Sequence, residues 1–320
     1  MLHALARGPV SLGVFRFLLG IGEAGNWPAG VKVATEWFPV RERALASGIF
    51  NSGSSIGAML APPVVAWIVL QFGWPASFVL VGTTGFLWVA VWLAVYRSPP
   101  GAPRKPDQPA PLWRLARTPW MMRFTLSKVF SDPAWYFYIF WFPQYLSSAR
   151  GFDLVSIGKY AWIPFVTADL GNFFGGFLAA RLIRTGMAVQ RARKVCVLFF
   201  AILMTASIPA VLVASAYVSI ALISIATMGY TGALANMLAI PADRFPPHAV
   251  GSVWGLASMG AGFGGMVFSL ITGWVVEHYS YIPVFFGFGV LPLIAAWIVW
   301  TLPGNPDHRL TDAGAPGGGD

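Results

Sequence analysis

The sequence has little charge and almost no cysteine, and each shortage excludes a class of protein. Only 10% of its 320 residues are Asp, Glu, Lys or Arg, whereas soluble domains carry about 25%. One cysteine, Cys196, is too few for a disulfide framework or a multi-cysteine metal site. The four histidines stand in loops or near the ends of apolar runs without metal-ligand spacing, and no phosphate-binding glycine loop is present. We therefore expect neither an ordinary soluble domain nor an enzyme, and no cofactor or metal.

Long apolar runs take the place of charge. The chain is 57% hydrophobic with a mean hydropathy of +0.66, and a bilayer core about 30 Å thick requires roughly 20 apolar residues per helix. Nine such runs lie at residues 10–36, 48–70, 78–96, 121–146, 160–180, 195–213, 217–241, 251–276 and 282–302. They are too uniformly apolar for amphipathic helices and too long for barrel strands. The sequence therefore predicts an all-α polytopic membrane protein.

The excess of basic residues predicts how the chain is oriented in the membrane. There are 21 Lys and Arg against 12 Asp and Glu, a formal charge of +9. Fourteen basic residues fall in 37–47, 97–120, 181–194, 242–250 and the segment from 303, and three fall in the opposite loops. Because basic loops stay in the cytoplasm, we expect a multi-pass inner-membrane protein with a cytoplasmic C-terminus and no nucleic-acid partner. Residues 1–9 lack the apolar core of a signal peptide.

Composition divides the chain into four parts. Residues 1–96 hold three apolar runs, 97–120 are rich in Pro and basic residues, 121–302 hold six runs, and 303–320 are rich in Gly and Pro. We expect a partial N-terminal bundle of three helices, a cytoplasmic linker, a C-terminal six-helix bundle and a disordered tail, in a monomer.

An internal repeat relates the two bundles. At an offset of 207 residues Glu36 meets Asp243, and the Phe-Pro pair at 38–39 meets the pair at 245–246. The glycines at 48, 53 and 57 meet those at 255, 260 and 264. Both turns fall on the Arg-rich side, so the copies are parallel, one of the known plans of transporters. Because only the last three of the six C-terminal runs have counterparts, the repeat predicts a twelve-helix plan with nine helices present.

Two charged residues in the first run are the leading candidates for function. Arg16 and Glu23 are seven residues apart, so on a helix they share one face and lie about 10 Å apart along it. A charge at mid-bilayer costs about 2.5 to 3.5 kcal/mol, so such residues face a cavity or a partner. The spacing suits an arginine that holds a substrate carboxylate and a carboxyl group that loads a proton. The alternative is that Arg16 extends to the outer surface and Glu23 pairs within the bundle.

Charges near the ends of runs predict a gate. Glu36 and its repeat counterpart Asp243 each precede a Phe-Pro turn, so both are candidates for ion pairs that break when an inner gate opens. Anchoring at the membrane interface is the alternative for Glu36. The expected partners are Arg41 or Arg43 for Glu36, and Arg181 or Arg184 for Asp243.

Other polar residues within the runs have two interpretations each. Asp169 either lines a cavity or is a buried, hydrogen-bonded group. The ring-dense segment 135–142 fits packing or an interface belt, but Tyr136 and Tyr138 can also offer hydroxyls to a sugar-like ligand. Asn236 in the seventh run has the same two interpretations.

Four stretches are distinctive in combination. They are RFLLGIGEAGNWPA at 16–29, EWFPVRERALASGIFN at 36–51, DPAWYFYIFWFPQYL at 132–146 and RFPPHAVGSVWG at 244–255. Together they resemble the major facilitator superfamily, and within it the anion:cation symporters for hexuronate, galactonate and glucarate. The resemblance extends from about residue 10 to 302 and implies two six-helix bundles, with the first run in the place of the family's fourth helix.

The resemblance also implies roles for particular residues. Arg16 takes the place of the family's carboxylate-binding arginine, Glu23 that of its protonatable acid, and Asn26 in the same motif is a further substrate-binding candidate. The family's seventh and tenth helices line its cavity, which favours Tyr136, Tyr138 and Asn236. The Asp-Arg pair of the family's first helix has no counterpart in this chain.

The leading hypothesis is a secondary active transporter in which a proton gradient drives symport of a hexuronate, aldonate or aldarate by alternating access. Two alternatives stay open. One is an N-terminally truncated fragment that does not transport. The other is a facilitator for a drug or another organic anion.

Overall fold

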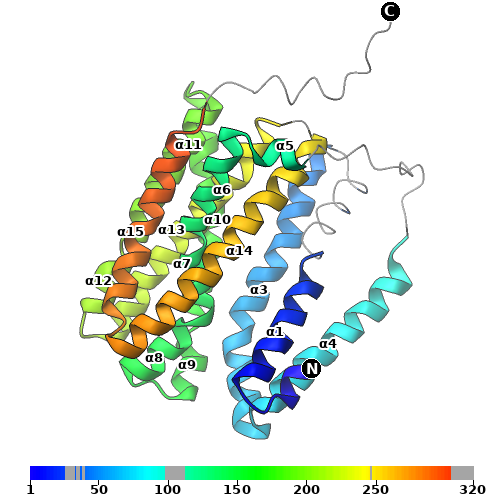
Figure 1. Ribbon diagram of the computed structural model, residues 1–320, viewed down its shortest axis with the longest axis vertical. Coiled ribbons are helices and arrows are strands. Elements are labelled where there is room, and N and C mark those ends of the chain that lie inside the picture. Colours follow the sequence, from blue (N-terminus) through cyan, green and yellow to red (C-terminus); the bar gives the residue numbers. More distant parts are fainter. Residues whose placement is uncertain (26–32, 34–36, 38–39, 98–111, 246, 304–320) are drawn as a thin grey trace, which may run out of the picture. The chain divides into compact units, whose positions relative to one another are not determined.

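The structure is a computed structural model that describes residues 1–25, 33, 37, 40–97, 112–245 and 247–303. For 40–52, 54–55 and 247–249 it describes the backbone alone. Every regular element in the described part is helical, as the sequence predicts. The chain forms two compact units (Figure 1). The N-terminal unit comprises Met1–Pro106 and Asp153–Trp162, and the C-terminal unit comprises Asp107–Phe152 and Ile163–Asp320.

The N-terminal unit has few helices and little buried surface. Its elements are the 3-10 helix η1 (Leu2–Leu5) and the helices α1 (Pro9–Glu23), α3 (Val40–Phe72), α4 (Trp74–Val95) and α9 (Leu154–Tyr160). No residue of α1 is buried, and none of the apolar window of α4 is buried. The apolar faces of these helices are therefore available to lipid or to other helices.

The C-terminal unit holds most of the core. Its helices are α5 (Leu112–Ala116), α6 (Pro119–Ser131), α7 (Pro133–Phe140), α8 (Phe142–Arg150), α10 (Ile163–Arg184), α11 (Val189–Met204), α12 (Ser207–Leu212), α13 (Ala216–Ala242), α14 (Pro247–His278) and α15 (Ile282–Trp300). Helix α13 packs against both α10 and α11, and 61% of its apolar window is buried. A cluster that includes Phe124, Met237, Val253 and Val299 joins α6, α13, α14 and α15.

Among the described residues, six helices are long and apolar enough to cross a membrane, against nine predicted runs. The run at 121–146 is divided into α6, α7 and α8, which follow one another through the C-terminal unit (Figure 1). The first turns of α7 and α8 contain Pro133 and Pro143, and each proline lacks the N–H that would continue the helical ladder. The runs at 10–36 and 48–70 include residues that the structure describes incompletely.

The internal repeat is confirmed by the helix bounds. Helices α1 and α13 begin at residues 9 and 216, which is the offset of 207. Helices α4 and α15 keep it to within two residues at each end. A register found from glycines and one acidic turn therefore also describes where the helices start.

The glycines of the two repeat copies make different contacts. On α14, a Cβ at Gly260 would lie 2.8 Å from the Thr125 carbonyl oxygen, and one at Gly264 would lie 2.9 Å from the Cα of Val129. Helix α14 therefore touches the backbone of α6 at both glycines. Their counterparts on α3, Gly53 and Gly57, meet no atom of the described residues within 4 Å.

A close contact between α10 and α13 depends on another glycine. A Cβ at Gly175 would lie 2.5 Å from the carbonyl oxygen of Gly232 on α13, a distance that real Cβ atoms do not tolerate. Small residues let membrane helices approach in this way, and the backbones then pack directly. The neighbouring Gly176 is exposed and has no atom within 4 Å of its Cβ position, so the two glycines differ only in what they touch.

We expect Gly175→Val to lower the free energy of unfolding by about 1 to 3 kcal/mol relative to Gly176→Val, because only the first forces α10 away from α13. Both substitutions change helix propensity alike, so each controls for the other. Thermal unfolding of the purified protein in detergent, followed by tryptophan fluorescence, measures the difference. Equal unfolding midpoints for the two variants would contradict the close packing of α10 and α13.

Candidate functional site

The two charged residues predicted to carry transport lie on α1. Arg16 and Glu23 are both exposed, and neither has an ion-pair partner among the described residues. At 1.5 Å per residue their separation along the helix is about 10 Å, too far for a direct salt bridge. Both side chains of the predicted pair are thus available for ligands.

Near the start of the chain, the His3 ring packs against Phe15 and Phe78. Burial and the positive charge of Arg16 lower the pKa of His3.

The structure does not describe the side chains of three other predicted site residues. Asn26 and Glu36 lie outside the described residues, and only the backbone of Arg41 is described. The predicted roles of Asn26 in substrate binding and of Glu36 and Arg41 in gating stay predictions.

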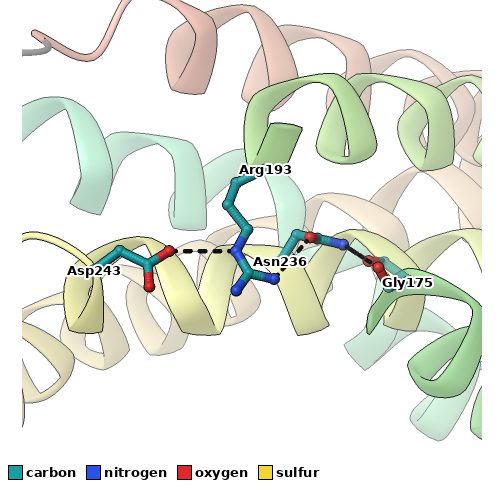
Figure 2. Close-up of polar contacts among 5 residues, drawn as sticks. Gly175, Arg193, Asn236 and Asp243 are labelled. Carbon is teal, nitrogen blue, oxygen red and sulfur yellow. Dashed lines mark hydrogen bonds and ion pairs between the residues drawn. The ribbon is translucent and has the colours of Figure 1, made fainter. Parts of the chain in front are cut away.

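A polar cluster ties three helices together at the arginine-rich end of the C-terminal unit (Figure 2). Arg193 on α11 donates from Nε to Oδ2 of Asp243 at 3.3 Å and from a terminal nitrogen to Oδ1 of Asn236 at 3.4 Å. The amide nitrogen of Asn236 donates to the carbonyl oxygens of Gly175 and Gly232, both at 3.0 Å. We call Arg193, Asn236 and Asp243 the Arg193 latch, since they join α11 to α13 and, through Gly175, to α10.

The Arg193 latch corrects one prediction and changes another. Asp243 does pair with a basic residue of segment 181–194, but the partner is Arg193, and the expected pairing with Arg181 or Arg184 is wrong. Arg184 bonds instead to the Ala180 carbonyl in its own helix. Asn236, a predicted substrate ligand, is fully buried with both amide hydrogens donated to protein carbonyls. In this structure it supports helix packing and has no amide hydrogen left for a ligand.

The two predicted tyrosine ligands lie in different surroundings. Tyr138 is 1% exposed, so it belongs to the core. Tyr136 is half-buried, stacks on Phe140 with its ring 2° from parallel, and lies beside Gly265 of α14. Of the two, only Tyr136 has exposed surface for a ligand.

Sequence reasoning missed a buried ion pair in the run at 121–146. The Nζ of Lys128 lies 2.8 Å from Oδ1 of Asp132, with the two side chains 3% and 11% exposed. The signal was present in the sequence, since a base and an acid four residues apart share a helix face. Asp132 also directly precedes Pro133, which starts α7.

Basic residues also donate hydrogen bonds to carbonyls at the C-terminal ends of helices. Arg150 donates to the carbonyls of Ala210 and Val213 at the end of α12 and to the Tyr145 hydroxyl, which in turn contacts Ser219 of α13. At the arginine-rich end, three cations donate to carbonyls in the last residue of α15 and just after it: Arg123 to Thr301, Lys194 to Trp300 and Leu302, and Arg244 to Pro303. Cations at helix C-termini satisfy carbonyls that have no partner in the helix itself.

A hollow of about 350 Å³ lies in the N-terminal unit, and none of these polar groups lines it. Its lining is almost entirely apolar and aromatic, and it contains none of the predicted site residues. Trp88, Trp92 and Tyr96 stack one above another along α4 beside it. This arrangement is typical of aromatic residues placed at a membrane interface.

For the Arg193 latch we expect Arg193→Gln to lower the free energy of unfolding by about 1 to 2 kcal/mol, because it leaves Asp243 unpaired and removes a donor to Asn236. The control Arg184→Gln removes a charge from the same end of the unit, where among the described residues the side chain bonds to its own helix alone, and should change stability by less than about 0.5 kcal/mol. Thermal unfolding of the two variants checks this. A larger loss for Arg184→Gln would show that the predicted partner, not the observed one, holds the helices.

Comparison with known proteins gives a consistent family. The sequence model of the Major Facilitator Superfamily matches residues 2–251 and 185–318. A hexuronate transporter of Escherichia coli (strain K12) is 30% identical over 322 residues, which is 94% of this chain and 74% of the relative. A galacturonate transporter of Dickeya chrysanthemi is 33% identical over 240 residues, 68% of this chain and 69% of the relative.

Two further comparisons bear on substrate and fold. A probable sulfoacetate transporter of Cupriavidus necator is 29% identical over 300 residues, 87% of this chain and 69% of the relative. The crystal structure of a bacterial homologue of the human lysosomal transporter Spinster has a TM-score of 0.68 at 21% identity, over 93% of this chain and 78% of the other, and shows the fold. The chain belongs to the major facilitator superfamily, a family of membrane transporters and not of enzymes.

Proposed function

We propose that this chain is a proton-coupled symporter of sugar acids that works by alternating access in the inner membrane. The observation that carries the proposal is the exposed pair of Arg16 and Glu23 on α1, in a chain that aligns over 94% of its length with a hexuronate transporter. Relatives named for hexuronate, galacturonate and D-galactonate support a small carboxylated sugar as substrate.

Arg16 is suited to the carboxylate of such a substrate. Its planar guanidinium presents parallel N–H donors that match the two oxygens of a carboxylate, which a lysine ammonium does not. Among the described residues no acid neutralises Arg16. A substrate anion would supply the missing opposite charge, so binding would be selective for carboxylates over neutral sugars.

Glu23 is suited to carry the proton. A carboxyl group removed from water favours its neutral form, so closure of a cavity around Glu23 would load it and opening to the cytoplasm would release the proton. Because Arg16 and Glu23 lie about 10 Å apart on one face, they do not neutralise each other. Substrate and proton can therefore occupy the protein together.

The gate in this proposal uses the Arg193 latch. The pair of Arg193 and Asp243 joins the start of α11 to the end of α13, and Glu36 with Arg41 would act at the repeat-related position of the N-terminal unit. The excess of basic residues in this set of loops supports a cytoplasmic location for this end and for the C-terminus. Breaking the latch would then favour the inward-open state.

In proteoliposomes with the outside acidic, we expect the chain to accumulate D-galacturonate and Glu23→Gln to lower the steady-state accumulation ratio about tenfold per pH unit of gradient. Each coupled proton contributes about 1.4 kcal/mol per pH unit, which corresponds to that factor. Exchange of internal for external D-galacturonate, which needs no net proton movement, should persist. Asp153→Asn, an exposed helix cap where Asn serves as well as Asp, is the matched control.

Different failures of this assay have different meanings. Uptake by the unsubstituted chain that ignores the gradient would contradict proton coupling. Uptake of sulfoacetate but not of D-galacturonate would favour an organic-anion facilitator, and a chain that binds neither would favour a non-transporting fragment.

Arg16→Lys should weaken D-galacturonate binding at least tenfold, because lysine lacks the two parallel donors of the guanidinium group. Unchanged affinity would contradict the assigned role of Arg16.

We further expect Asp243→Asn to raise the inward-open population. The chain has one cysteine, Cys196, which is fully buried, so Ala242→Cys gives a single exposed reporter next to the latch. The rate of maleimide labelling at position 242 should rise severalfold in Asp243→Asn and stay unchanged in Arg184→Gln. Equal labelling rates with and without Asp243→Asn would contradict the gating role.

A further inference from the structure

The ion pair of Lys128 and Asp132 is the most buried charge in the described part of the C-terminal unit. Lys128 lies in the last turns of α6 and Asp132 at its junction with α7, and their side chains are 3% and 11% exposed. The other ion pair of the described residues, between Arg193 and Asp243, is 20% and 28% exposed at the end of its helices. Charges within a membrane bundle are costly and are by default candidates for function.

The donors around the pair are arranged unevenly. The carboxylate of Asp132 accepts from Lys128 Nζ at 2.8 Å and from Ser131 Oγ at 2.9 Å, and Tyr230 on α13 is near enough to interact with it. The ammonium of Lys128, in contrast, has one oxygen partner among the described residues, Asp132, and its other neighbour is the Trp254 ring with its centroid 5.6 Å away. Two of the three ammonium hydrogens therefore have no oxygen acceptor in this part of the chain.

Stability alone does not explain such a pair. Apolar side chains of similar volume usually stabilise a core as well as a buried salt bridge does, because desolvation offsets most of the attraction between the charges. Removing one partner is costly, however, so any group that separates Lys128 from Asp132 must provide a replacement charge. A substrate carboxylate would replace Asp132 as the negative partner of Lys128, and a proton would neutralise the carboxylate of Asp132.

The surroundings of the pair are suited to a small organic acid. Trp135 and Tyr230 stack with their centroids 5.1 Å apart and their rings 8° from parallel, and Tyr136 is half-buried one turn beyond Asp132. Such rings pack against the apolar face of a sugar while hydroxyls bond to its edge. The titratable groups that face Asp132 are Lys128, Tyr136 and Tyr230. From α14, the side chain beside the pair is Trp254, which does not titrate.

We propose that Lys128 and Asp132 form a carboxylate-exchange site in which a substrate carboxylate replaces Asp132 as the partner of Lys128 while Asp132 takes up a proton. The hydrogen bond from Lys128 to Asp132 breaks and one to the substrate forms, and the proton comes from solvent and binds a carboxylate oxygen of Asp132. The net charge of the site is zero before and after, so one anion and one proton load together. This inference rests on the proposed function and adds a second proton site to Glu23 and a second carboxylate site, occupied in turn with Arg16.

Titration calorimetry with D-galacturonate in two buffers of different ionisation enthalpy counts the protons taken up per substrate bound. We expect Asp132→Asn to lower that number by about one and Lys128→Met to weaken binding at least tenfold. Asp153→Asn, the same chemical change at an exposed cap, should alter neither value. An unchanged proton count in Asp132→Asn would overturn the exchange site.

Single substitutions leave one charge unpaired, so two further variants make the test independent of their folding. Lys128→Met combined with Asp132→Asn keeps the site neutral, and we expect weaker binding with one proton fewer. Glu23→Gln lies on exposed α1 and should still take up about one proton on binding. Binding by Glu23→Gln without proton uptake, or a double variant identical to the unsubstituted chain, would overturn the site alone, whereas no D-galacturonate binding by the unsubstituted chain would overturn the proposed function with it.

Discussion

A charged or polar group inside a bilayer must find its partner within the protein, because lipid tails offer no hydrogen bond. In the C-terminal unit, cations at the ends of the helices also bond to groups of other helices. Arg150 holds the end of α12, Lys194 holds the end of α15, and Arg193 joins α11 to α13. Each of these cations connects elements that are distant in sequence, so the same contacts that satisfy charge also fix the bundle.

Much of the fold could be predicted from the sequence, because apolar length and glycine spacing are local properties. The 207-residue repeat agrees with the starts of α1 and α13, at residues 9 and 216. Partners could not be predicted in the same way, because they depend on which face a helix turns toward its neighbours. Asn236 therefore was interpreted as a ligand for substrate, whereas the α10 backbone and Arg193 occupy its side chain.

The ion pair of Lys128 and Asp132 could not be predicted from hydropathy, because the run at 121–146 is long and apolar enough for a membrane span in spite of both charges. Its spacing and the following proline were nevertheless visible, and both have structural consequences. Pro133 has no N–H for the Val129 carbonyl four residues earlier. Gly264 of α14 packs against that part of α6, so the two helices meet there through backbone surfaces.

A contact between backbone surfaces slides more easily than one between interlocking side chains, and small shear motions of packed helices are a common form of conformational change. The ring of Trp254 would couple the position of Lys128 to such a motion. It lies beside Lys128 on one side and edge-on to Phe124 on the other, with ring centroids 5.8 Å apart. If Lys128 turns from Asp132 to a substrate carboxylate, its ammonium shifts against a ring carried by α14. Loading of the exchange site would therefore act directly on α14, whose backbone contacts that of α6.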